Sequence, residues 1–509
     1  MKKKNIIRYS QADFEILQKH FKAAGENETQ VFTLFSNAVS QKCNIYIANI
    51  QLIPDQNELQ NQSPVSIEPL REFQATAYSL AYETGKSICD EHTHPFTQKP
   101  NFSSIDNHHG QKNAIYLSKY LPDSATMLMV VFGDGMKHFQ AQVWNREESC
   151  FEPIDRLEVL GSPIQILEED TIDGVCVNDP YARHRIIPGW IQDLLGKIKV
   201  FVVGLSGNGS LALQGLVALG VGKSTGWIKC CDHDELEASN LPRIPYAYEK
   251  DIGKPKAEIA EAYARNKDAD INVSCYNEPI ESQRMLNYVK EANVILDCVD
   301  RDGPRKIINR YSVRYGIPLV SIGSEIIPEK DSYEAIGQIR VVNPGKTGCM
   351  MCSGMIDPSE AVLDLLPEDI QNQRAKAGYI RGSDQTPTPS VLHLNGVTSN
   401  LAISQFLRLV FGEDLSGKEF MHYDRQSCNI LTASIPPDPD CPVCGTKGYL
   451  AAGDEEFEYK AIINDKSIGR FELRDGKVIE QSHEESSNPE TNAQDNNENK
   501  KNANRTNSD

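Results

Sequence analysis

The sequence predicts an α/β protein with at least two folded domains and a disordered tail. A chain of 509 residues is too long for a single hydrophobic core. From Lys199 onward, a strand, a glycine-rich loop, a helix and a second strand follow in the order that is typical of a parallel α/β sheet. Residues 482–509 contain no Val, Ile, Leu, Met or aromatic residue, so they cannot contribute to a core.

The composition limits the possible partners and compartments. The formal net charge of −19 would repel nucleic acid, and no cluster of Lys and Arg offsets it. No apolar run approaches the roughly 18 residues that a membrane helix needs. The basic start of the chain lacks the apolar segment of a secretion signal. We therefore expect a cytoplasmic protein that binds neither nucleic acid nor a membrane.

Residues 1–165 are expected to form a mixed α/β domain. Two helical stretches, Phe14–Phe21 and Leu70–Thr84, alternate with strand-like runs. The strand-like runs are Val31–Phe35, Asn44–Ile50, Thr126–Phe132 and Phe139–Trp144. Acidic residues concentrated in 166–180 indicate a linker, which sets the expected domain boundary.

Residues 181–450 are expected to form the parallel-sheet domain, followed by a small extension over 451–481 and the tail. Its strand-like runs are Lys199–Val203, Trp227–Cys231, Asn272–Cys275, Val294–Cys298 and Leu319–Ile322. Helical segments such as Lys256–Asn266, Gln283–Glu291 and Ala402–Phe411 lie between or after them.

The loop after the first of these strands contains Gly204, Gly207 and Gly209. Glycines allow a tight turn, and they let backbone N–H groups and a helix N-terminus approach phosphate. Such a loop can also serve packing alone. The next strand ends in Asp232, whose carboxylate can accept hydrogen bonds from ribose hydroxyls. Together, the loop and the aspartate predict a nucleotide site.

Three motifs follow in order. Residues 232–243 read D-H-D-E-L-E-A-S-N-L-P-R, residues 253–257 read G-K-P-K-A, and residues 296–300 read L-D-C-V-D. Over about 270 residues, this series resembles the signatures of the ThiF, MoeB and ubiquitin-activating superfamily. The resemblance implies a Rossmann-like domain that uses ATP and magnesium to adenylate the C-terminal carboxylate of a ubiquitin-like protein. Ser206 stands where the family usually has a glycine.

The resemblance also implies roles for individual residues. Asp232 would hold the ribose, and Asp300 would place the magnesium ion. The triphosphate would contact Asn240, Arg243 and Lys256. Attack of a carboxylate on phosphorus brings two anions together, so cations are needed there independently of any resemblance. The alternative is that Arg243 and Lys256 are solvated surface charges and that Asp300 caps a helix.

Partners follow from the same resemblance. Arg183 matches an arginine that the family reaches across a dimer interface, which implies a homodimer. Many ubiquitin-activating relatives carry a cysteine shortly before a Gly-Val, but Leu392 occupies that position here. After Asp300, Cys428 is the one cysteine outside the C-x-x-C pairs, and we expect it on a strand, as a small buried side chain. We therefore expect direct transfer to the cysteine of a separate conjugating enzyme, or to another acceptor.

Two C-x-x-C pairs supply four thiolates, which suffice for a closed tetrahedral zinc site. The ligands would be Cys349, Cys352, Cys441 and Cys444. Their wide separation leaves open whether the two pairs meet or form separate knuckles. ThiF and MoeB relatives carry such pairs on either side of the crossover segment, so the resemblance favours one structural zinc.

A second constellation lies in the N-terminal domain. His92 and His94 alternate at the end of a strand, and Asp106 follows after a turn. Two imidazoles and a carboxylate form a zinc site that leaves one position for water. The string resembles the H-x-H-P…S-x-x-D motif of JAMM (JAB/MPN) metallopeptidases, which implies Glu28 as general base and Ser103 beside the oxyanion. The segment between His94 and Ser103 is one residue longer than in that family; the alternative is a degenerate binding domain.

The combined prediction is a peptidase that processes or deconjugates a ubiquitin-like protein, fused to the enzyme that activates it. Such fusions resemble components of bacterial ubiquitin-like conjugation systems. One alternative is activation of a sulfur-carrier protein for cofactor biosynthesis. Another is a scaffold that binds a ubiquitin-like protein without chemistry.

Overall fold

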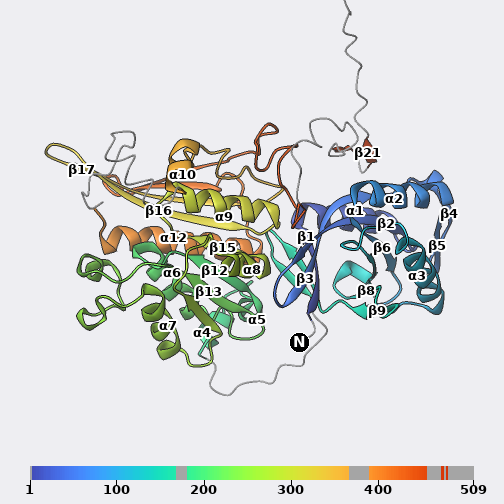
Figure 1. Ribbon diagram of the computed structural model, residues 1–509, viewed down its shortest axis with the longest axis horizontal. Coiled ribbons are helices and arrows are strands. Elements are labelled where there is room, and N and C mark those ends of the chain that lie inside the picture. The colour runs from blue at the N-terminus through green and yellow to red at the C-terminus, as the bar shows by residue number, and fades with distance from the viewer. Residues whose placement is uncertain (1–2, 168–179, 366–388, 456–471, 475–476, 480–509) are drawn as a thin grey trace, which may run out of the picture.

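The computed structural model of the protein describes residues 3–167, 180–365, 389–455, 472–474 and 477–479. Two large sheets dominate these residues, one in the N-terminal part and one in the C-terminal part (Figure 1). Most of the predicted linker, 168–179, and the predicted tail, 482–509, lie outside the described residues. None of the described helices is long and apolar enough to span a membrane.

The N-terminal sheet has nine strands in the order β11-β10-β1-β3-β2-β6-β7-β8-β9. The strands are β1 (Lys4–Ser10), β2 (Gln30–Val39), β3 (Cys43–Leu52), β6 (Ser87–His94), β7 (Met127–Gly133), β8 (Phe139–Asn145), β9 (Cys150–Pro153), β10 (Arg156–Leu160) and β11 (Gln165–Leu167). β1 pairs in parallel with β3 and β10, and β6 with β7, whereas β2 is antiparallel to both its neighbours. The predicted mixed α/β character is confirmed.

Helices cover both faces of this sheet. α1 (Gln11–Ala23) buries Phe14, Leu17 and Phe21 against one face. α2 (Arg71–Thr84) and α3 (Ser104–Leu117) bury Phe73, Ala77 and Ala114 against the other. A small hairpin, β4 (Leu59–Ser63) and β5 (Ser66–Pro69), stands apart from the sheet.

The second sheet has eight strands in the order β14-β13-β12-β15-β16-β17-β18-β19. The strands are β12 (Lys199–Val203), β13 (Trp227–Cys231), β14 (Val273–Tyr276), β15 (Val294–Asp297), β16 (Leu319–Pro328), β17 (Tyr333–Val342), β18 (Phe420–Asp424) and β19 (Asn429–Ala433). The strands from β14 to β16 pair in parallel, as the sequence predicts, and those from β16 to β19 are antiparallel.

In the part of the second domain that the structure describes, the helices are α4 (Ala182–Arg185), α5 (Gln192–Lys197), α6 (Gly207–Ala218), α7 (Lys256–Lys267), α8 (Gln283–Glu291), α9 (Asp302–Arg314), α10 (Pro358–Asp364) and α12 (Leu392–Phe411). The predicted start of the last helix at Ala402 is wrong by ten residues. Its first turns bury the polar residues Asn395, Thr398 and Ser399, which hydrogen bond to neighbouring groups, so they lack an apolar pattern.

The strand order places a topological switch point between β12 and β15. From β12 the chain moves outward through β13 to β14, and it then returns to the other side of β12 through β15 and β16. In such sheets the crevice at the carboxyl ends of the strands, beside the switch point, binds ligands. The glycine-rich loop follows β12 and therefore lies at this point.

One buried cluster contains residues of both sheets, in addition to the two clusters on the faces of the N-terminal sheet. Ile6, Ile45, Ile47 and Leu160 of the N-terminal sheet belong to the same buried cluster as the interior of the second domain. β1 and β3 lie where the two parts meet (Figure 1). The two sheets on either side of the predicted boundary thus contribute to one shared buried cluster at their interface.

A buried arginine bridges this domain interface. Arg8 has no exposed surface; its guanidinium donates to Glu158 Oε2 at 2.9 and 3.1 Å within the N-terminal domain. It also donates to the carbonyl oxygens of Tyr315 and Ala292, both at 3.2 Å, in the second domain. Burial would raise the pKa of Glu158, but Arg8 and Arg156 hold it at about 2.

A short segment after the last cysteine pair also joins the domains. Ala451 and Gly453 donate backbone hydrogen bonds to Val313 and Arg314 of α9, at 3.1 and 3.0 Å. The next residue, Asp454, donates to the carbonyl of Asn37 in β2 at 2.8 Å. Residues 449–455 thus form an interdomain strap, which hydrogen bonds to α9 of the second domain and to β2 of the N-terminal domain.

We predict that Arg8→Met lowers the free energy of unfolding by about 3 kcal/mol, because Glu158 is left buried without its main cation. Urea denaturation of the full chain measures the effect. Lys346→Met is the matched control, since it removes an exposed interdomain ion pair to Glu15 of 2.8 Å and should change stability by at most about 1 kcal/mol. Equal losses in the two variants would contradict a special role for Arg8.

Candidate functional site

The glycine-rich loop is tightly packed. Gly204 has a φ of +86°, and a side chain there would crowd the carbonyl oxygen of Cys298 at 3.0 Å. A side chain on Gly207 would collide with Asn395 of α12, and one on Gly209 with the carbonyl of Gly204. α6 begins at Gly207, and no side chain of the described residues caps its N-terminus. Its first N–H groups are therefore suited to bind an anion.

Asp232 lies at the carboxyl end of β13, beside this loop. Its side chain accepts hydrogen bonds from the backbone N–H groups of Leu205 at 2.7 Å and Asp234 at 2.9 Å. Burial raises the pKa of Asp232, and the nearby ammonium of Lys256 counteracts that rise. The carboxylate is thus fixed in orientation at the edge where a ribose would lie.

Two cations and an amide lie around the same edge. Asn240 is buried within the 3₁₀ turn Ala238–Arg243, where its Oδ1 accepts the N–H of Glu237 at 3.2 Å. Arg243 donates to the carbonyl of Ser239 at 3.1 Å. The Cδ atom of Arg243 would lie 3.5 Å from a Cβ atom added to Gly207, so this side chain lies beside the glycine-rich loop. Lys256 begins α7, and its Nζ lies 2.8 Å from Asp234 Oδ2. The structure therefore brings the expected phosphate-binding residues to one edge.

The loop after β15 presents Asp300 from the other side of the switch point. Asp300 is exposed, whereas Asp297 is fully buried. Asp297 accepts from Ser321 Oγ at 2.7 Å and from the Val299 N–H at 3.1 Å, and it pairs with Arg305 at 3.4 Å. These contacts fix the loop on which the candidate magnesium ligand stands. The sequence motifs alone did not assign Asp297 or Arg305 a role.

Arg183 lies away from the loop of its own chain. The ring of Tyr181, two residues earlier, packs against Gly220, beyond the C-terminus of α6. A helix of 12 residues is about 18 Å long, so this contact lies at the opposite end of α6 from the glycine-rich loop. Arg183 is exposed there. Within one chain it does not belong to the cluster.

The two C-x-x-C pairs meet. Cys349 Sγ lies 3.6 Å from Cys441 Sγ, and Cys352 Sγ lies 3.3 Å from Cys444 Sγ. A tetrahedral site with Zn–S bonds of about 2.3 Å has S–S edges of about 3.8 Å. The four thiols therefore match a closed tetrahedral site, which answers the question that the sequence spacing left open.

The N-terminal constellation also assembles. One ligand atom from each of His92, His94 and Asp106 lies within 4.8 Å of the others. Both histidines are buried at the end of β6, and Asp106 stands in the first turn of α3. Glu28, buried just before β2, places Oε1 3.6 Å from His94 Nε2. Ser103 caps α3, with its Oγ accepting the Asp106 N–H at 3.1 Å, so its hydroxyl proton remains a donor.

The carboxylates of this pocket favour positive charge on His92. Burial alone would lower the pKa of His92, but Asp106 and Asp90 raise it to about 9. Burial raises the pKa of Glu28 to about 7. The buried Nε2 of His92 has no hydrogen-bond partner among the described residues; Asp106 Oδ2 is 3.7 Å away. A buried ring nitrogen without a hydrogen-bond partner, beside a carboxylate and a second imidazole, fits a zinc ligand set.

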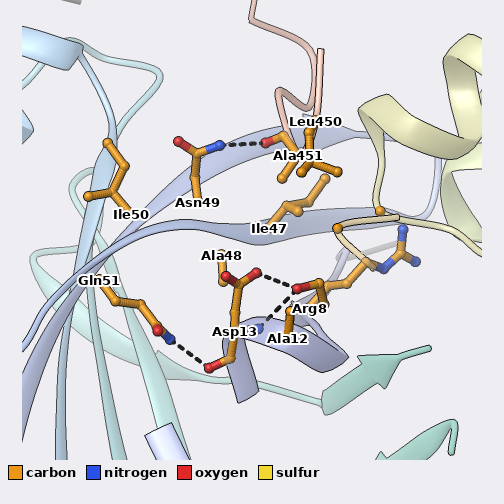
Figure 2. A pocket seen from close by; sticks show the side chains of 13 residues that line it. Arg8, Ala12, Asp13, Ile47, Ala48, Asn49, Ile50, Gln51, Leu450 and Ala451 are labelled. Atoms are coloured by element: carbon orange, nitrogen blue, oxygen red, sulfur yellow. Dashed lines mark hydrogen bonds between the residues drawn. The ribbon is translucent and has the colours of Figure 1, made fainter. Parts of the chain in front are cut away.

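A cavity of about 200 Å³ lies at the domain interface, and Figure 2 shows the residues that line it. None of the expected site residues lines it. The polar groups in it serve packing: Gln51 donates to the carbonyl of Asp13 at 3.1 Å, and Asn49 to that of Ala451 in the interdomain strap at 3.2 Å.

The predicted placement of Cys428 on a strand, as a buried residue, is wrong. Cys428 is exposed in the turn between β18 and β19, with a φ of +55°. Asp424 ends β18 because its side chain accepts the N–H of Gln426 at 3.0 Å, which starts a turn. Leu392, at the position of the missing cysteine, is the first residue of α12.

Comparisons with known proteins concern mainly the second domain. A profile described as the ThiF family matches residues 181–443. The chain is 28% identical over 284 residues to the SAMP-activating enzyme E1 of Haloferax volcanii, covering 55% of this chain and 93% of that protein. It is 26% identical over 265 residues to the sulfur carrier protein ThiS adenylyltransferase of Bacillus subtilis, covering 51% and 68%. The crystal structure of E. coli MccB with succinimide aligns with 50% of this chain and 69% of its own, at 24% identity and a TM-score of 0.39, too low to support an argument.

We predict that the purified chain holds a zinc ion on its four clustered cysteines, and that Cys444→Ser releases about one zinc per chain and lowers the melting temperature by several degrees. Zinc content by mass spectrometry and thermal unfolding measure the two effects. Cys150→Ser, at an exposed thiol, is the control. Unchanged zinc content in Cys444→Ser would contradict the assignment.

Proposed function

The chain belongs to the ThiF family, whose profile spans about half of it, and we propose that it is an ATP-dependent adenylyltransferase that activates the C-terminal carboxylate of a ubiquitin-like or sulfur-carrier protein. One observation carries this proposal. The uncapped N-terminus of α6 lies at the switch point of the parallel sheet, and Asp232, Arg243 and Lys256 converge on the same edge.

The proposed reaction forms an acyl-adenylate. A carboxylate oxygen of the partner attacks the α-phosphorus of ATP, the bond to the bridging oxygen of the β-phosphate breaks, and pyrophosphate leaves with that electron pair. Arg243, Lys256 and the N–H groups of α6 would neutralise the charge that develops on the phosphates. Asp300 would hold a magnesium ion, which would supply further positive charge beside the phosphates.

The names of the two relatives support this substrate class. One is named for activating SAMP and the other for adenylylating the sulfur carrier ThiS. We propose a ubiquitin-like modifier as the substrate and direct transfer from the adenylate to a conjugating enzyme or another acceptor, because Leu392 replaces the cysteine of many ubiquitin-activating relatives. The alternative within the same chemistry is sulfur-carrier activation, in which sulfide is transferred to the adenylate.

We also propose that the enzyme works as a homodimer. Arg183 is too far along α6 to reach the loop of its own chain. The large apolar side chains beside it are exposed: Ile186 by 79%, Ile187 by 45% and Ile191 by 52%. A second copy that covers these side chains would bring Arg183 to the other chain's triphosphate, as the family resemblance implies.

For the N-terminal domain we propose a zinc-dependent peptidase that cleaves after the tail of the same ubiquitin-like protein. The convergence of His92, His94 and Asp106, with Glu28 at 3.6 Å from His94, supports it. A zinc ion there would activate water and polarise the scissile carbonyl. Glu28 would accept the proton of the attacking water, and the Ser103 hydroxyl would donate to the oxyanion.

Asp300→Ala and Arg243→Ala should each reduce partner-dependent exchange of pyrophosphate into ATP by about 10²- to 10³-fold, because the metal anchor or a fixed cation is lost. The assay uses purified ubiquitin-like and sulfur-carrier proteins that end in Gly. Asp331→Ala, at an exposed site beyond β16, is the control. Near-normal exchange in both site variants would refute the assignment, and no exchange by the wild-type chain with any partner would favour a scaffold.

Glu28→Gln should slow cleavage of a ubiquitin-like fusion protein by about 10²- to 10⁴-fold and leave pyrophosphate exchange unchanged, because the general base is lost far from the nucleotide edge. His92→Ala should abolish cleavage, since a zinc ligand is removed. Gel analysis of the fusion, with and without a chelator, measures the result. Cleavage that persists in both variants and under chelation rules out a metal mechanism.

A further inference from the structure

Lys256 is the most buried cation at the nucleotide edge, and it has a fixed partner. Its side chain is 8% exposed, and its Nζ donates to Asp234 Oδ2 at 2.8 Å. Arg243, the other cation, contacts a backbone carbonyl instead. An ammonium in so enclosed a place needs an anion beside it, because burial of an unpaired charge is strongly unfavourable.

Backbone pairing builds the geometry of this ion pair. The N–H of Lys256 donates to the carbonyl of Asp234 at 2.9 Å, and Leu236 donates to the carbonyl of Lys254 at the same distance. A β-bridge joins Glu235 to Pro255 between them. The two segments therefore run side by side, which sets this pair apart from a surface ion pair between two freely moving side chains.

Asp232 and Asp234, two residues apart in the same motif, make different contacts. Asp232 is buried and accepts two backbone N–H groups, one of them from Asp234 itself. The side chain of Asp234 is 56% exposed, and its Oδ2 holds Lys256. Lysine has a flexible stem and no preferred fork geometry, so the place of its Nζ depends on what holds it.

We propose that Asp234 is a positioning residue for adenylation, whose carboxylate holds the Lys256 ammonium at the edge where the phosphates of ATP bind. The inference rests on the proposed function for the place of the phosphates. Asp234 acts through Lys256 and does not touch the nucleotide. Its negative charge is neutralised by the same contact, so it does not repel the triphosphate.

Equilibrium binding to the full chain tests the proposal, with ATP plus magnesium and with adenosine as probes. Asp234→Asn should weaken ATP binding about ten-fold and leave adenosine binding within about two-fold, because adenosine has no phosphates. In a Lys256→Met background, the same change should alter ATP binding by less than about two-fold. Glu15→Gln, which removes the exposed 2.8 Å pair with Lys346, is the control and should change neither affinity.

The outcomes separate the inference from the proposed function. A wild-type chain that binds no ATP refutes the proposed function itself. ATP binding that is unchanged or tighter in Asp234→Asn refutes the inference alone, as does an equal loss with and without Lys256. An equal loss of adenosine binding overturns the inference too, because Asp234 then shapes the site as a whole. Asp234→Ala is a second variant with the same expectations if the asparagine variant does not fold, and thermal unfolding reports folding.

Discussion

A buried cation must lie against a fixed anion or carbonyl oxygen, and this requirement shapes both the domain interface and the nucleotide edge. At the interface, the Arg8 guanidinium is shared between Glu158 and two carbonyls of the second domain, so the N-terminal sheet and the parallel sheet are held in one orientation. At the nucleotide edge, Lys256 lies against Asp234, and Arg305 against Asp297. In each case the anion is placed by backbone or strand geometry before any ligand binds. The two domains and their candidate sites are therefore preorganised. Both sites lie on elements of the two sheets, and the two sheets contribute to one shared buried cluster.

The two halves of the functional proposal have different support. Membership of the ThiF family concerns residues 181–443, where motifs, sheet topology and cation placement agree. The peptidase proposal depends on the geometry of one pocket: two buried histidines, an aspartate on a helix N-terminus and a buried glutamate whose Oε1 lies 3.6 Å from His94 Nε2. That geometry is demanding, because residues from before β2, the end of β6 and the start of α3 must all converge. Packing alone gives no reason to bury a histidine nitrogen that has no hydrogen-bond partner among the described residues, which is why the pocket fits a metal better than it fits a core.

Much of the fold and of the nucleotide edge could be predicted from the sequence, because short local sequence patterns specify strands and turns. β12, with its glycine loop, and β13, which Asp232 follows, are predicted by apolar runs and by a turn with a positive φ at Gly204. Long-range events could not be predicted. Whether Cys349 meets Cys441 depends on how the chain between them folds, and spacing contains no information about that. The shared core was missed because β1 and β3 carry apolar residues for both faces, and a sequence does not say which face meets which domain. The early turns of α12 were missed because they bury polar groups that bond across the structure, which breaks the apolar period.

The proposed chemistry of the two sites is complementary. Hydrolysis after the tail of a ubiquitin-like protein consumes water and leaves a free carboxylate, and adenylation consumes that carboxylate together with ATP. In this proposal, the product of the first site would thus be the substrate of the second. Because Arg8 and the interdomain strap hold the two described domains in one orientation, the contacts between them oppose a hinge motion that would carry a tail from the zinc ligands to the glycine loop. The partner would then have to leave one site and bind the other, so fusion on one chain would raise the local concentration of the processed tail without channelling it. In this proposal Glu28 would activate water in a different pocket from the one in which the adenylate would form, and this would protect the adenylate from hydrolysis.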